Sequence, residues 1–226
     1  MDRSAHSHRE IAVSADGSAT LWVPGLDEHY HSIHGALTES LHVFIEHGLR
    51  FAVEQMKGQG PVAILEVGLG TALNARLSFE FAREQGASLA YEALEKYPIT
   101  PEEAAQLAQV GMEAERVFLS APHNETIDLD GGTFALRVND LRAFEPEPSG
   151  YDLVYFDAFA PSAQPELWTL PIFEKMFAAL RPGGTLVTYC AKGDVKRAMK
   201  AAGFVVEALP GPPRKREMTR ARKPTL

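Results

Sequence analysis

A glycine-rich turn and a series of carboxylates are the features of this sequence with the clearest chemical potential. The turn lies in Glu66-Val67-Gly68-Leu69-Gly70-Thr71-Ala72-Leu73-Asn74, after a short apolar run and before a helical pattern. Glycine allows the backbone to turn tightly and to approach a ligand closely. The turn therefore predicts a small-molecule site, although a tight strand-to-helix turn without a ligand has the same pattern.

The residues around the glycines distinguish between two kinds of ligand. The dinucleotide fingerprint G-x-G-x-x-G requires glycine or alanine at its last position, where this sequence has Leu73. Glu66 precedes the first glycine, and a carboxylate there suits the ammonium of an amino-acid-like ligand that has no pyrophosphate. The pattern disfavours a nicotinamide oxidoreductase and favours S-adenosylmethionine, with Gly68, Gly70 and Asn74 beside the cofactor.

Two further carboxylates follow the next strand patterns. Glu95 ends the second run, where a carboxylate can accept hydrogen bonds from both ribose hydroxyls of an adenosyl group. Asp140 follows the third run and could accept a hydrogen bond from the adenine amino group. Each acid alone is typical of a solvated loop, but their succession at strand ends strengthens the prediction of an adenosyl cofactor.

These residues need a scaffold, and the sequence predicts one of alternating strands and helices. Apolar runs predict strands at 62–67, 89–94, 134–138, 152–156 and 185–189, and helical spacing predicts helices at 72–85, 101–110, 172–180 and 195–202. Thr100 and Glu103 form a capping box before one helix. We expect a Rossmann-like α/β fold of the class I methyltransferase type, a mostly parallel twisted sheet with helices on both faces.

The chain is predicted to form a single methyltransferase domain, residues 1–226. An N-terminal extension, 1–58, carries a predicted β-hairpin at 11–24 and a helix at 37–56, which Gly58 and Gly60 end. The Rossmann-like core is predicted to span 59–226. Ligands of such sheets bind at the carboxyl ends of the strands.

Composition restricts the class of protein. The chain has 226 residues, 45% apolar and 23% charged, and no apolar run near the roughly 20 residues that cross a bilayer. Its one cysteine, Cys190, excludes an internal disulfide, and a cytoplasmic location is expected. Histidines cluster in the N-terminal region, but the chemistry needs no metal and none is expected; they are His29, His31, His34, His42 and His47.

The charge is distributed unevenly. The net charge is −8, but residues 210–226 alone carry +5, so the remaining residues carry −13. A basic strip on an acidic body can hold phosphate. A solvated tail is the other interpretation of the same composition.

Several motifs resemble one enzyme family. The most specific are Asp157-Ala158-Phe159-Ala160-Pro161, Pro165-Glu166-Leu167-Trp168-Thr169, Arg181-Pro182-Gly183-Gly184-Thr185-Leu186, Gly203-Phe204 and Arg214-Lys215-Arg216-Glu217-Met218. Together with Tyr30–Ala36, Glu39-Ser40, the glycine turn and Glu95-Lys96-Tyr97-Pro98, they resemble the tRNA 5-(aminomethyl)-2-thiouridine methyltransferase family. The resemblance runs through most of the chain in the same order.

The resemblance implies a reaction. Members of this family use S-adenosylmethionine to methylate the exocyclic amine of 5-aminomethyl-(2-thio)uridine at the tRNA wobble position. The product is 5-methylaminomethyl-(2-thio)uridine, and the implied partner is the tRNA anticodon loop. Lys96 joins the implied cofactor residues. Some members are fused to an FAD-dependent oxidase; this chain ends soon after the methyltransferase motifs, so we expect the stand-alone form.

The implied reaction also needs residues on the substrate side, and the sequence offers candidates. Asp157 is the candidate to hold the substrate ammonium and to receive its proton, although it could instead cap the turn that follows. The other candidates are Phe159, Pro161 and Trp168 as a wall against a flipped-out uracil, and Lys215 and Arg216 as phosphate contacts. Core or lid packing for the aromatic residues, and a charged strand edge for the basic ones, remain alternatives.

The glycine turn departs from the family pattern. The family usually has Gly-Phe-Gly-Thr-Gly-Leu-Asn, whereas this chain has Leu69 and Ala72. Leu69 is a mild apolar exchange. Ala72 opens a helix, where alanine is tolerated if its φ is negative, and we expect activity to be retained.

Two other functions stay open. A methyltransferase or aminopropyltransferase acting on a small amine would suit the acidic body. A non-catalytic adenosyl- or RNA-binding module is a third reading, which the intact set of Glu66, Glu95, Asp140 and Asp157 disfavours.

Overall fold

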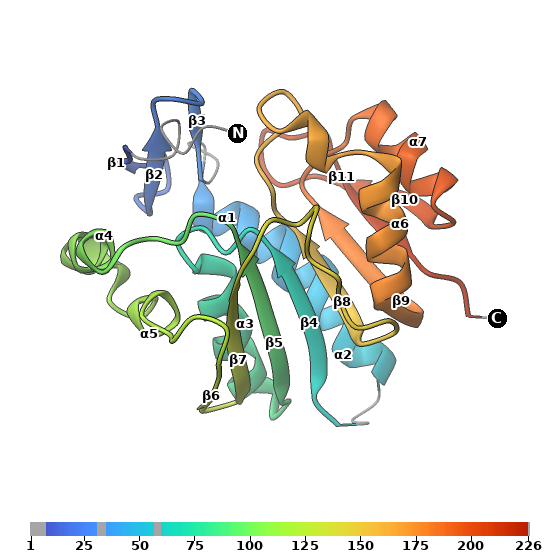
Figure 1. Ribbon diagram of the computed structural model, residues 1–226, viewed down its shortest axis with the longest axis horizontal. Helices are drawn as coiled ribbons and strands as arrows, with labels where there is room; N and C mark the ends of the chain where they lie inside the picture. The colour runs from blue at the N-terminus through green and yellow to red at the C-terminus, as the bar shows by residue number, and fades with distance from the viewer. Residues whose placement is uncertain (1–7, 31–34, 57–59, 226) are drawn as a thin grey trace.

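The computed structural model describes residues 8–30, 35–56 and 60–225 and is built around one eight-stranded sheet (Figure 1). The strand order is β10-β11-β9-β8-β4-β5-β7-β6. The parallel strands are β4 (Val62–Val67), β5 (Leu89–Glu95), β7 (Gly132–Val138), β8 (Tyr151–Phe156) and β9 (Leu180–Thr188). The antiparallel strands are β6 (Thr126–Leu129), β10 (Val205–Pro210) and β11 (Glu217–Arg222). The predicted Rossmann-like class I fold is confirmed.

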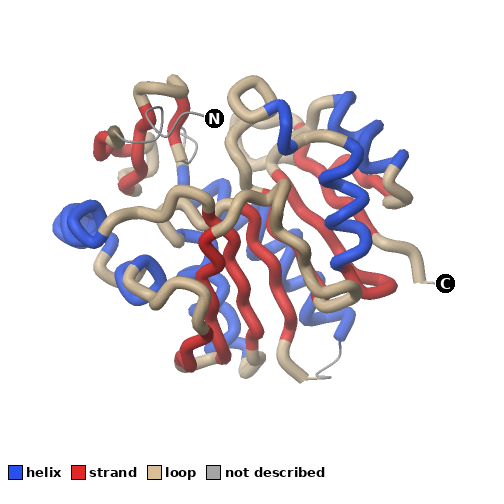
Figure 2. Tube along the Cα trace, viewed as in Figure 1, coloured by secondary structure: helices blue, strands red, loops and turns tan. Residues whose placement is uncertain are grey.

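Helices cover both faces of this sheet, as Figure 2 shows. Because side chains alternate along a strand, Tyr155 of β8 belongs to one core and its neighbours Val154 and Phe156 to the other. The Tyr155 core lies under α3 (Leu73–Gln85), and the other lies under α6 (Leu170–Ala179) and α7 (Gly193–Ala201). The shorter helices are α4 (Pro101–Leu107), a π-helical segment (Ala108–Met112), α5 (Arg116–Leu119) and a 3-10 turn (Pro165–Leu167).

The N-terminal region adds a small sheet and a long helical segment. The small sheet has β1 (Glu10–Val13), β2 (Ala19–Val23) and β3 (Glu28–His29), which confirms the predicted hairpin. The helical segment comprises α1 (Ala36–Ser40), a π-helical stretch (Leu41–Arg50) and α2 (Phe51–Met56), so the predicted 37–56 helix is confirmed. Gly48 lets this segment press against the sheet, because a Cβ there would lie 3.0 Å from Val187 Cγ2. Gly58 lies outside the described residues.

The C-terminal region differs from one of its expected forms. Residues 205–222 form a hairpin whose second strand, β11, pairs with β9 inside the sheet, so a solvated tail is wrong. Met218 packs into the core on one face of the sheet and Ala221 into the core on the other, so β11 is buried on both sides, as an internal strand requires. In the described parts of the chain, no helix has the length and hydropathy needed to cross a membrane.

Candidate functional site

A cavity of about 300 Å³ lies at the carboxyl ends of β4, β5, β7 and β8. The chain passes from β4 to β5 on one side and later, after β7, crosses to β8 on the other side of β4. The strand order therefore switches at β4, which is where sheets of this kind have a crevice. The N-terminal region closes the crevice from above with Tyr30 and Glu39, and Lys215 from the β10–β11 connection reaches its rim. The predicted site residues Gly68, Gly70, Glu95, Lys96, Asp140, Asp157, Phe159 and Lys215 line this cavity.

Other parts of the protein lie so close to the glycine turn that they leave no room for side chains at Gly68 and Gly70. Gly68 has φ +90°, and a Cβ there would lie 2.8 Å from the Asp157 carbonyl oxygen. Gly70 has φ +55°, and its Cβ would lie 2.8 Å from Cδ1 of Tyr30. Close packing of the protein against itself therefore already requires glycine at both positions, which also line the cavity.

Ala72 has a left-handed backbone conformation. Its φ is +65° and its ψ is +19°, which is left-handed, and its side chain is fully buried at the N-terminal boundary of α3. The condition of a negative φ, under which alanine is easily tolerated, is therefore not met, because the turn continues into the helix through this left-handed residue. A non-glycine residue there costs about 1–2 kcal/mol.

Glu95 ties two strand ends together. One carboxylate oxygen accepts a hydrogen bond from the backbone N–H of Tyr97 (2.8 Å), and the other accepts one from Gly70 (3.3 Å). The carboxylate is thus held between the turns after β4 and β5, in the cavity where the sequence predicted it.

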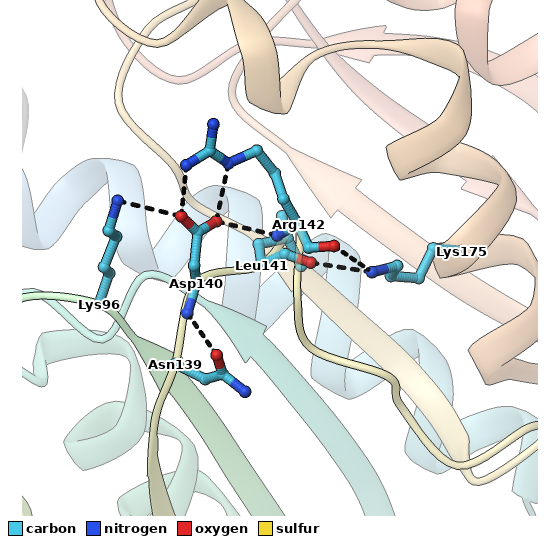
Figure 3. Close-up of polar contacts among 6 residues, drawn as sticks. All are labelled: Lys96, Asn139, Asp140, Leu141, Arg142 and Lys175. Carbon is cyan, nitrogen blue, oxygen red and sulfur yellow. Dashed lines mark hydrogen bonds and ion pairs between the residues drawn. The ribbon is translucent and has the colours of Figure 1, made fainter. Parts of the chain in front are cut away.

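Asp140 is surrounded by cations, as Figure 3 shows. Arg142 donates to it from Nε (3.0 Å), from Nη2 (2.5 Å) and from its backbone N–H (3.0 Å), and Lys96 Nζ lies 3.0 Å away. The hydrogen bonds from Arg142, with a further contribution from Lys96, hold the pKa of Asp140 well below its usual range. Asp140 therefore stays ionised at all physiological pH values.

Lys175 was not identified from the sequence, yet it fixes the segment that carries Asp140. Its Nζ donates to the carbonyl oxygens of Leu141 (3.1 Å), Arg142 (3.0 Å) and Phe144 (2.6 Å). It extends from α6 to the loop after β7 (Figure 3). A lone lysine in a helix gives no sequence signal for such a contact.

Asp157 has the opposite environment. The Asn74 side-chain amide donates to it (2.8 Å), and the Asp157 backbone N–H donates to the carbonyl of Val67 (3.0 Å). Burial, with a smaller contribution from the charge of Glu39, raises the pKa of Asp157 to about 7, against opposing effects of Asn74 and Lys215. This carboxyl can exchange a proton near neutral pH.

Glu66 lies behind the glycine turn. It is fully buried; Asn74 donates to one of its oxygens (3.0 Å) and the Tyr91 hydroxyl to the other (2.8 Å). Burial raises its pKa well above the usual range. This placement corrects the expectation that Glu66 contacts a ligand ammonium. Asn74 also lies behind the turn, where its side-chain amide donates to the carboxyls of both Glu66 and Asp157.

Lys215 is turned into the cavity. Its Nζ forms an ion pair with Glu39 of α1 and lies 4.7 Å from the ring centroid of Tyr189. The Tyr189 hydroxyl donates to the carbonyl of Ala158 (2.8 Å), which fixes the ring. Tyr189 and Glu39 were not predicted as site residues from the residues themselves, although Glu39 belongs to a family motif.

A second cavity of about 530 Å³ adjoins the first. Both cavities are lined by Ala160, Tyr189 and Lys215, so they meet there. Pro161 and the exposed cations Lys192 and Arg216 line the second cavity only.

Trp168 belongs to the core. It is 6% exposed, its ring packs edge-on against Phe156 at 4.9 Å, and its Nε1 donates to the carbonyl of Phe159 (2.8 Å). The expectation that Trp168 stacks on a base is therefore corrected: the buried Trp168 ring supports the loop after Asp157 through its hydrogen bond to Phe159. Phe159 lies in the cavity wall, 5.2 Å from the ring of Tyr30.

Much of the basic strip is engaged within the protein. Arg220 and Arg222 both pair with Glu207, and Lys223 donates to the carbonyls of Phe177 and Leu180. Arg216 is exposed at the second cavity. The charge available for a polyanion is thus smaller than the composition indicated.

The described residues contain no group of three or more His, Cys, Asp or Glu side chains placed to hold a metal ion. His31 and His34 lie outside the described ranges. The rings of His42 and His47 pack against each other at 4.7 Å.

Comparison with known proteins adds family information to this geometry. The sequence profile of a family described as S-adenosyl-L-methionine-dependent methyltransferase matches residues 102–224. The chain is 33% identical over 231 residues to the tRNA 5-methylaminomethyl-2-thiouridine biosynthesis bifunctional protein MnmC of Chromobacterium violaceum, and 32% identical over 200 residues to that of Pseudomonas entomophila. These alignments cover 95% and 82% of the chain but 34% and 31% of the relatives. The chain therefore spans about a third of the length of these curated relatives.

A solved structure shares the fold over nearly the whole chain. The crystal structure of MnmC2 from Aquifex aeolicus superposes with a TM-score of 0.77 at 28% sequence identity, covering 97% of this chain and 73% of that one.

Proposed function

Given that the chain belongs to the S-adenosyl-L-methionine-dependent methyltransferases, we propose that it methylates the exocyclic amine of 5-aminomethyl-(2-thio)uridine at the wobble position of tRNA. The observation that carries the proposal is Asp157, a carboxyl at the cavity wall whose pKa is about 7. The curated MnmC relatives, whose name refers to 5-methylaminomethyl-2-thiouridine biosynthesis, support the choice of substrate. A cytoplasmic location follows from that substrate.

The cavity fits the cofactor. Leu94 and Leu141 offer apolar surface for a planar base between the carboxylates of Glu95 and Asp140. Carboxylates are the acceptors that ribose hydroxyls and an adenine amino group require. We assign the ribose to Glu95 and the adenine side to Asp140 with Lys96, and the Gly68–Gly70 turn to the methionine part.

The bound cofactor supplies an electrophilic methyl group on a positively charged sulfur. The substrate amine must be neutral to attack it, and a lysine-like amine has a pKa of about 10.4, so deprotonation at pH 7 costs roughly 4.6 kcal/mol. We assign to Asp157 the holding of this ammonium, its orientation and the acceptance of its proton. Asn74 positions Asp157 by its hydrogen bond.

The second cavity is the proposed entrance for the anticodon loop. Phe159 and Pro161 line the two cavities on the side of the Asp157 loop, and aromatic surface suits an unpaired base. Lys192 and Arg216 at the rim are proposed to contact phosphate. Lys215, paired with Glu39, is not assigned to phosphate.

The test is nucleoside analysis. The protein is incubated with methyl-labelled S-adenosylmethionine and tRNA that carries 5-aminomethyl-2-thiouridine. The expected product is labelled 5-methylaminomethyl-2-thiouridine, and tRNA lacking the aminomethyl group should remain unlabelled. Label transferred only to a small polyamine offered in parallel would reject the tRNA function in favour of a small-amine transferase.

A further inference from the structure

The ion pair at the junction of the two cavities has the features of an occupied binding subsite. We propose that Glu39 and Tyr189 form, beside Asp157, the subsite for the substrate's ammonium group, and that Lys215 fills it in the absence of substrate. The proposal rests on the proposed function only in requiring a primary amine as substrate.

The chemistry of the contacts supports this. A carboxylate and an aromatic face together are how proteins commonly recognise alkylammonium groups. The ammonium of Lys215 has both: it is paired with Glu39, whose side chain is only 13% exposed, and lies 4.7 Å from the ring centroid of Tyr189. A lysine ammonium on its aliphatic stem resembles an aminomethyl group on a nucleobase in charge and size.

The location is also suitable for the reacting amine. Glu39, Tyr189 and Lys215 all line the first cavity with Asp157, and Tyr189 and Lys215 extend into the second. The charges of Glu39 and Lys215 act on the pKa of Asp157 in opposite directions, and Glu66, Tyr91 and Tyr189 are further titratable groups near it. A substrate that enters from the second cavity meets Lys215 before it meets Asp157.

Competition by Lys215 should reduce apparent affinity for an amine. When a site can bind its ligand only while an internal group is displaced, the apparent dissociation constant is the intrinsic constant divided by the fraction of molecules in which the site is open. The ion pair with Glu39 is partly exposed, and one cation–π contact with Tyr189 adds to it. Together these contacts of Lys215 should lower the apparent affinity for an amine about tenfold.

The experiment measures amine binding by calorimetry with the full chain. The probes are benzylammonium, the nucleoside 5-aminomethyluridine, and uridine as the uncharged control. Lys215→Met should bind both amines about tenfold more tightly than wild type, with no gain for uridine. In the Lys215→Met background, Glu39→Gln should reverse this gain, because Glu39 is the proposed partner of the substrate ammonium once Lys215 is absent. Lys200→Met is the control, since Lys200 is an exposed lysine of α7 that lines neither cavity, and it should change nothing.

The outcomes separate this proposal from the proposed function. Unchanged or weaker amine binding by Lys215→Met overturns the subsite, even if tRNA is methylated. A gain for benzylammonium supports the subsite, even if wild-type protein leaves 5-aminomethyl tRNA unlabelled and the tRNA function fails. Thermal melts monitor folding, and Lys215→Gln, which retains a hydrogen-bond donor for Glu39, replaces Lys215→Met if the latter melts early and must show the same direction of change.

Discussion

Asp140 and Asp157 are the same residue type, each following a parallel strand of one sheet, yet their surroundings shift their pKa values in opposite directions. Asp140 is held by Arg142 and Lys96, and its pKa lies well below the usual range. Asp157 accepts a hydrogen bond from the neutral side-chain amide of Asn74, and burial at the cavity wall raises its pKa to about 7. Environments that separate the pKa values of two carboxyls in this way are typical of sites where the two have different roles, which supports the proposed roles of Asp140 as a permanent charge for binding and of Asp157 as a proton acceptor.

The largest effect expected from this comparison is on the chemical step. Asp157→Asn should lower the single-turnover methylation rate by about 10²- to 10⁴-fold at pH 7, because an amide cannot accept the proton. The rate should recover in part at high pH, where more of the amine is already neutral. Asp140→Asn, at saturating cofactor, should keep a rate near wild type. A normal rate for Asp157→Asn at pH 7 would remove this carboxyl from the mechanism.

Cofactor binding should depend on the other side of the cavity. Glu95→Ala should weaken S-adenosylmethionine binding by about 1–3 kcal/mol, the range for a lost charged hydrogen bond. Calorimetry measures the dissociation constant, and Glu92→Ala is the control, since Glu92 lies on the same strand but bonds to Tyr151 (3.0 Å). Equal dissociation constants for the two variants would contradict the assignment of Glu95.

The two aspartates should also have opposite effects on stability. The folded-state pKa of Asp157 is raised, so its stabilising contribution is full below about pH 4 and is lost as the pH rises to about 7. Asp157→Asn should therefore raise the free energy of unfolding at pH 8 by about 1–3 kcal/mol, with a smaller gain at pH 5. Asp140→Asn should lower it at pH 8 by less than about 1 kcal/mol, since its ion pairs are partly exposed. Urea denaturation at both pH values measures this, and the same sign for both variants would refute the comparison.

The glycine turn connects the two sides, and its strained residue gives the smallest prediction. Ala72→Gly loses a buried methyl but relieves a left-handed alanine, so the free energy of unfolding should stay within about 1 kcal/mol of wild type. Ala75→Gly removes an equally buried methyl from the interior of α3, and it should lower the free energy of unfolding by about 1–2 kcal/mol more than Ala72→Gly does. Equal losses in urea denaturation would show that Ala72 is not strained.

Local patterns were sufficient for much of the scaffold. Thr100 and Glu103 form the predicted capping box in α4, because both partners lie within one helical turn. The apolar run 62–67 is a fully buried strand, as its lack of alternation indicated. Glu95, Asp140 and Asp157 meet at one cavity because the ends of parallel strands must lie on one edge of the sheet.

Contacts between distant segments could not be predicted in this way. Glu66 is the last residue but one of β4 and Glu95 is the last residue of β5. Only the three-dimensional packing shows that Tyr91 and Asn74 enclose Glu66, whereas Glu95 lines the cavity. Trp168 lies in a family motif, and its burial against Phe156 depends on how a loop folds back over the sheet. A sequence pattern records which residues are present, and the direction of a side chain at a strand end depends on its neighbours.

The order of the strands has a consequence for synthesis on the ribosome. β11 lies between β9 and β10 but follows both in the chain, and Thr219–Arg222 pair with Thr185–Thr188 of β9. In a nascent chain that has emerged only as far as β10, the edge of β9 is unpaired. β10 cannot join the sheet either, because its partner β11 has not yet been made. Lys215 emerges with the same hairpin, so the cation that reaches Glu39 arrives only as the sheet closes. The hairpin that completes the sheet therefore also brings Lys215 to the junction of the two cavities.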